Sequence, residues 1–157
     1  MKHQRDMEGA FPVSAMKGLT PLEALSVRCL RLWHDPAHGP AAMGTMLARR
    51  LGPERGTACH RALADVMGMI ARHGRRRLAR HGAECGCVGV DEAIFAHFIA
   101  TAATGDREDA MLVASLLVDS AVLLPLTDSA RQAGLCLHRA ALRPTGAMPE
   151  PMSATRH

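Results

Sequence analysis

Residues 53–73 read PERGTACHRALADVMGMIARH and show the clearest helical periodicity in the chain. Pro53 suits the first position of a helix, and Gly74 follows where a helix would end. The apolar residues between them recur every three or four positions, as on one face of a helix: Cys59, Leu63, Val66 and Ile70. We therefore predict a helix from about Pro53 to His73 whose apolar face packs on other helices.

The same spacing continues on both sides of this segment. Residues 20–23, TPLE, match a capping box with proline at the first helical position. Further helices are predicted over about 21–33, 40–51, 91–104, 106–118 and 123–143. The helix over 106–118 is apolar enough that we expect it to be central. No internal repeat occurs, and no alternating pattern exceeds a few residues.

These patterns predict an all-α fold, a compact bundle of five to six helices in a single domain over 19–143. Residues 1–18 are expected to be a flexible arm, and residues 144–157, rich in proline, a flexible tail. Residues 74–90 contain four glycines and are expected to form an irregular loop that also carries two cysteines. The 157-residue length is sufficient for one hydrophobic core without disulfide bonds.

Composition and charge bear on location and partners. The chain opens on charged residues with no apolar run behind them, and no stretch is long and apolar enough to span a membrane, so we expect a cytoplasmic protein. Residues 1–82 carry 14 basic and 6 acidic groups, whereas residues 83–157 carry 5 and 9. This asymmetry favours a protein partner or a homodimer in which the two halves pair. The 17 arginines are also what a GC-rich genome would produce.

Cysteine and histidine mark one candidate site. Cys85 and Cys87 flank a glycine in the loop, and His81 precedes them by four residues. Thiolate sulfur and imidazole nitrogen are the ligands that Zn²⁺ prefers, so this spacing indicates a zinc site, with His73 among the candidates for a fourth ligand. A reversible dithiol switch and an incidental turn remain alternatives. The other three cysteines, Cys29, Cys59 and Cys136, lie on apolar helical faces and are expected to be small buried hydrophobic residues.

A basic segment offers a second candidate surface. It could bind phosphates or an acidic protein, or could simply be a solvated helix end. Its residues are Arg72, Arg75, Arg76, Arg77 and Arg80. Residues 46–52, MLARRLG, are similar to the entry into a helix-turn-helix. That resemblance implies that Arg55 and Arg61 of the following helix would face duplex DNA.

No catalytic constellation is visible. The sequence lacks a Gly-rich phosphate loop, HExxH, GxSxG and SxxK motifs, and its acidic pairs, such as Asp91-Glu92, stand at helix starts where they favour the helix dipole. We therefore expect a non-enzymatic accessory or regulatory protein that binds zinc at the loop. A helix-turn-helix DNA-binding regulator and a ligand-free helical adaptor or self-associating scaffold are the alternatives.

Overall fold

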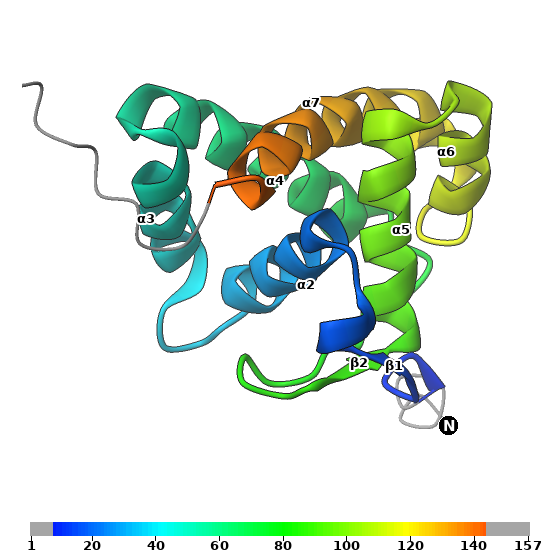
Figure 1. The fold of residues 1–157 in the computed structure, drawn as a ribbon. Coiled ribbons are helices and arrows are strands. Elements are labelled where there is room, and N and C mark those ends of the chain that lie inside the picture. Colours follow the sequence, from blue (N-terminus) through cyan, green and yellow to red (C-terminus); the bar gives the residue numbers. More distant parts are fainter. Residues whose placement is uncertain (1–7, 144–157) are drawn as a thin grey trace, which may run out of the picture.

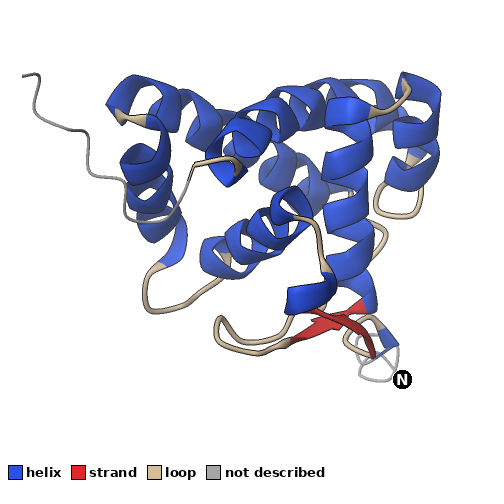
Figure 2. Ribbon diagram, viewed as in Figure 1, coloured by secondary structure: helices blue, strands red, loops and turns tan. Residues whose placement is uncertain are grey.

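The computed structural model describes residues 8–143 and confirms the all-α fold (Figures 1 and 2). Six helices are present in this range: α2 (Pro21–Trp33), α3 (Gly39–Leu51), α4 (Pro53–His73), α5 (Val90–Thr104), α6 (Arg107–Ala114) and α7 (Leu123–Ala141). Two short strands, β1 (Pro12–Ala15) and β2 (Cys87–Gly89), and two 3-10 turns, η1 (Met16–Gly18) and η2 (Ser120–Val122), complete the described chain.

Helices α5 and α7 form the centre of the bundle, and α7 packs against all five of the other described helices. Helix α5 contributes much of the core. It packs against α2, α6 and α7, and its Phe95, Phe98 and Ile99 are fully buried. Helix α7 crosses it closely because α7 carries Gly134 at the contact: a Cβ there would lie 2.7 Å from the carbonyl oxygen of Ile99. Figure 1 shows α7 running across one end of α5, with the two strands at the other end.

Helices α3 and α4 meet at a tight joint. Only Gly52 separates them, and its φ of 84° lies in the left-handed region that favours glycine. One turn later, Gly56 lies directly against the α3 backbone, where an added Cβ would be 2.6 Å from Cα of Ala48. The predicted helix boundary at residues 51–53 is therefore confirmed.

Helix α6 differs from its prediction. It ends at Ala114, not at Val118, and only its two alanines, Ala110 and Ala114, are buried. Leu112 and the following Leu116 are 69% and 61% exposed. The prediction that this helix is central was wrong, because overall apolarity does not reveal which face of a short helix meets the core.

The strands add structure at the end of the 74–90 loop and in the predicted N-terminal arm. Strand β1 pairs antiparallel with β2, placing Ser14 opposite Val88. Val88 packs with Val27 of α2 and Ala96 of α5 in a small second core. Residues 12–18 are therefore attached to the helical domain, whereas residues 1–7 of the predicted arm and the predicted tail, 144–157, lie outside the described residues.

Candidate functional site

The loop before α5 is organised by a buried carboxylate, Glu92. Its Oε1 accepts hydrogen bonds from Arg31 Nε at 2.7 Å and from the His81 backbone N–H at 3.0 Å. Its Oε2 accepts from Arg31 Nη2 at 2.9 Å and from the Gly89 N–H at 3.0 Å, which also caps α5. Glu92 lies in the first turn of α5, as predicted, and its carboxylate also forms a buried ion pair that was not predicted.

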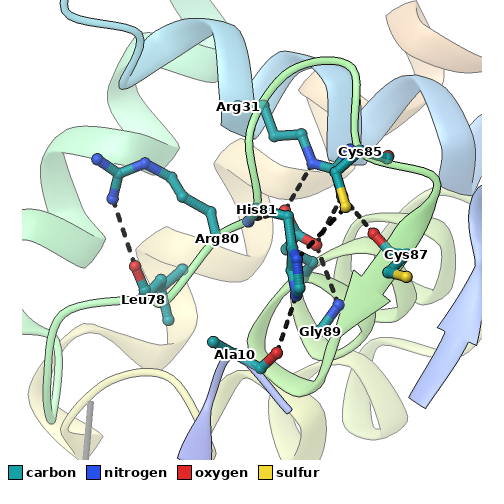
Figure 3. A network of polar contacts seen from close by, with 9 residues as sticks. Ala10, Arg31, Leu78, Arg80, His81, Cys85, Cys87 and Gly89 are labelled. Atoms are coloured by element: carbon teal, nitrogen blue, oxygen red, sulfur yellow. Dashed lines mark hydrogen bonds and ion pairs between the residues drawn. The ribbon is translucent and has the colours of Figure 1, made fainter. Parts of the chain in front are cut away.

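Arg31 extends this network to both loop cysteines. Its guanidinium group donates to the carbonyl oxygens of Cys85 at 2.7 Å and Cys87 at 2.6 Å (Figure 3). The hydrogen bond with Glu92 raises the pKa of Arg31 above its ordinary value, although burial opposes that shift. One available signal was the spacing on α2, where Arg31 follows the buried Val27 by four residues and thus occupies an apolar face.

Asp91 secures the first half of the loop. Arg76 donates to both of its carboxylate oxygens, at 2.5 and 2.6 Å, and the Ala79 N–H donates to one of them at 2.7 Å. Asp91 is 1% exposed, so this carboxylate is compensated inside the protein. Asp91 and Glu92 together hold a loop that contains little regular structure of its own.

His81 and Cys85, both predicted site residues, lie side by side (Figure 3). Cys85 Sγ stands 3.6 Å from His81 Nδ1. The other ring nitrogen, Nε2, donates to the carbonyl oxygen of Ala10 at 2.8 Å. This hydrogen bond assigns the proton to Nε2 and leaves the Nδ1 lone pair available to the sulfur or to a metal ion.

The remaining predicted metal ligands are not assembled with this pair. Cys87 is exposed at the start of β2, and His73 ends α4, where its carbonyl oxygen accepts from the Asp119 N–H. Over residues 8–143, no group of three or more His, Cys, Asp or Glu side chains is placed to hold a metal ion. The structure therefore brings together two of the four predicted ligands.

The other cysteines belong to the core, as expected. Cys29 and Cys59 are fully buried, and the partly buried Cys136 packs against the same cluster. Burial raises the pKa of the Cys29 thiol to about 12, with Arg50 opposing the shift. Burial also raises the pKa of Cys59, and its neighbours Cys136 and Cys29 add to the shift. The Cys29 and Cys59 thiols are therefore protonated and poorly reactive at neutral pH.

Two open pockets adjoin the loop and share Arg31 and Ala83. The first, of about 390 Å³, is bordered by Cys85, Arg28 of α2 and Met46 of α3. The second, of about 510 Å³, lies beside Arg80 and His81. Both volumes fall within the usual range for small-ligand sites.

The predicted basic surface is partly engaged by internal contacts. Arg76 pairs with Asp91, and Arg75 donates to the carbonyl oxygen of Ser115 at 2.9 Å. Arg72, Arg77 and Arg80 are exposed, as are Arg55 and Arg61 on α4. Acidic Glu54 and Asp65 are also exposed on α4, so this helix presents charges of both signs. DNA binding by this surface stays a prediction.

No helix in the described part of the chain is both long enough and apolar enough to cross a membrane. We found no match to this chain among protein-family models, curated proteins or solved structures.

Proposed function

We propose that this chain is a non-enzymatic regulatory protein that binds a zinc ion through Cys85 and His81, with Cys87 as a third ligand. The observation that carries the proposal is the Sγ–Nδ1 separation of 3.6 Å between Cys85 and His81. Zinc is bound at about 2.3 Å from sulfur and about 2.0–2.1 Å from nitrogen, and a tetrahedral angle then places the two ligand atoms roughly 3.5 Å apart. One ion would fit between these atoms with little movement of the loop.

The orientation of His81 supports the same proposal. Metal-binding histidines usually donate their second ring N–H to a carboxylate, a carbonyl or water, which fixes the ring and its tautomer. His81 makes such a contact with the carbonyl oxygen of Ala10. The nitrogen facing Cys85 is thus the unprotonated one that a metal requires.

The third ligand requires a local adjustment. Cys87 is exposed two residues after Cys85, and Gly86 between them has open space around it. A turn of this short segment would bring the Cys87 thiolate to the ion, and the two thiolates would balance the zinc charge. With three protein ligands, the fourth position on the ion would be left for water or for a group from a partner. Such an open position suits a regulatory site better than a purely structural one.

Metal binding would be linked to local order. The backbone carbonyls of Cys85 and Cys87 are held by Arg31, and the loop continues into the surface that carries Arg76 and Arg80. Zinc would stabilise this arrangement because a metal that binds the folded loop favours that state. A partner that binds the adjoining basic surface would then bind differently with and without zinc.

The test is zinc titration of anaerobically purified, metal-free protein without a histidine tag, in competition with a chromogenic chelator. We expect one zinc per chain, and a loss of affinity of at least about tenfold in Cys85→Ser and in His81→Gln. Cys136→Ser is the matched control, because this partly buried thiol lies on α7, away from the loop. The zinc affinity of this variant should equal that of the wild type. Equal zinc affinity in Cys85→Ser and wild type would contradict the proposal.

A further inference from the structure

The larger pocket beside the loop lies between the end of α2 and residues 79–83. Its volume of about 510 Å³ suits a small organic ligand. The lining combines basic side chains with loop backbone: Arg31, His34, Asp35, Pro36, Ala79, Arg80, His81, Gly82 and Ala83. Basic groups outnumber the single acidic one in this lining.

Two of these basic side chains, Arg80 and His34, form no ion pair within residues 8–143. Arg80 makes only a long contact, 3.5 Å, with the carbonyl oxygen of Leu78 (Figure 3). No hydrogen bond or ion pair joins the His34 ring to a described residue. Arg31 and His81 also line the pocket, but their nitrogen atoms already interact with groups of the loop network. Arg80 and His34 are therefore the side chains available to a ligand.

The single acid in the pocket does not neutralise them. The Asp35 carboxylate accepts from the Ala37 N–H at 2.8 Å and contacts the His38 ring at 3.2 Å. Burial lowers the pKa of His34, and Arg80 lowers it further. Because its pKa is lowered, His34 is neutral at pH 7 and can offer a ring N–H but no charge. Arg80 carries the charge that a bound anion would pair with.

Backbone donors complete the environment. The N–H groups of Gly82 and Ala83 donate to no acceptor in the described chain. The Arg80 guanidinium and the unpaired amides of the loop, together with the His34 imidazole at the end of α2, resemble the mixture of side-chain and backbone donors that binds phosphate oxygens. Arginine suits this role because its planar group can bind two phosphate oxygens at once.

We propose that this pocket binds the phosphate group of a small phosphorylated molecule, with Arg80 as the main ligand and His34 and the 82–83 amides as additional donors. The pocket is larger than one phosphate needs, so an organic part of the ligand would occupy the remainder. The proposal is independent of zinc, because Arg80 and His34 are not among the proposed metal ligands. The loop would then contribute to two sites, one for zinc and one for a phosphate group.

Inorganic phosphate and glycerol phosphate are the probes, titrated into metal-free ¹⁵N-labelled protein at pH 7 and constant ionic strength. We expect saturable shifts of the Gly82 and Ala83 amide signals, with tighter binding of glycerol phosphate. A charge-assisted hydrogen bond contributes about 1.5–3 kcal/mol, so Arg80→Gln should weaken binding by about tenfold or more. His34→Gln should also weaken it, and exposed Arg55→Gln on α4 should leave it unchanged.

Three results would overturn the proposal. The first is an absence of saturable amide shifts with either phosphate probe. The second is equal phosphate affinity in wild type and Arg80→Gln when both show the same thermal unfolding. The third is malonate binding as tightly as phosphate, which would mark the pocket as a general anion site. Zinc affinity measured on Arg80→Gln should match the wild type, which separates this proposal from the metal site.

Discussion

Arg31 and Glu92 form a buried ion pair, 2.7 Å between Nε and Oε1, that connects α2 to the start of α5. The two side chains are 2% and 0% exposed, so each depends on the other for compensation of its charge. The same two side chains also bind backbone groups from residues 81–89. The loop that carries His81 and Cys85 is therefore ordered by this pair more than by its own secondary structure.

Removing the charge of Glu92 should destabilise the whole fold. We expect Glu92→Gln to lower the free energy of unfolding by about 3 kcal/mol, because Arg31 would be left buried with an uncompensated charge. Urea unfolding at pH 7 measures this value. Glu108→Gln is the matched control, because Glu108 lies exposed in the first turn of α6 and its loss should cost under about 0.5 kcal/mol. Equal losses of unfolding free energy in the two variants would show that the Arg31–Glu92 pair does not stabilise the fold.

The same carboxylate should make stability depend on acid pH. Burial alone would raise the pKa of Glu92, but hydrogen bonds from Arg31, Gly89 and His81 outweigh it and place the pKa below its ordinary value. A lowered folded-state pKa stabilises the protein above the unfolded-state pKa, and this contribution disappears as pH falls through the folded-state value.

The free energies of unfolding of wild type and Glu92→Gln should therefore converge as pH falls below roughly 4.5. Urea titrations from pH 7 to pH 3 provide the comparison. A constant difference between the two proteins over this range would mean that the pKa of Glu92 is the same in the folded and unfolded states.

The cysteines should separate into two classes of reactivity. Cys87 is exposed, whereas Cys29 is fully buried with a pKa raised by burial to about 12. Brief iodoacetamide treatment of metal-free protein, followed by mass-spectrometric mapping, should label Cys87 first and Cys29 and Cys59 only after unfolding. Labelling of Cys29 as fast as Cys87 would show that the core around α2 opens readily.

Local sequence patterns predicted the helices because each helix carries its own apolar period and end signals. The stripe from Cys59 to Ile70, Pro53 and the residues before Gly74 all lie as predicted. The orientation of α6 was not predictable in this way. Its buried side chains are two alanines, and which face they occupy depends on α5 and α7, not on α6 alone.

In the candidate site too, contacts between residues close in the sequence were predictable, and contacts between distant residues were not. His81 and Cys85 are four residues apart, and their contact was predicted from that spacing. Arg31 lies 61 residues from Glu92, and Ala10 lies 71 residues from His81. Contacts at such separations leave little signal in one sequence, so the network that orients the site was missed.

Two glycine-to-alanine variants test the close contact between α3 and α4. A Cβ at Gly56 would lie 2.6 Å from Cα of Ala48 and 2.7 Å from its backbone nitrogen, and neither backbone atom can move without separating the helices. We expect Gly56→Ala to lower the free energy of unfolding by about 1–3 kcal/mol. Gly82→Ala is the control, because nothing lies within 4 Å of its Cβ position.

Urea unfolding of both variants measures the difference. The intrinsic preference of alanine over glycine in a helix would favour Gly56→Ala by up to about 1 kcal/mol. A net loss would therefore mean that the steric cost of separating α3 from α4 exceeds that gain. A higher free energy of unfolding in Gly56→Ala than in the wild type would show that α3 and α4 are not packed in backbone contact. The close approach of the two helices next to Gly52 would then be wrong.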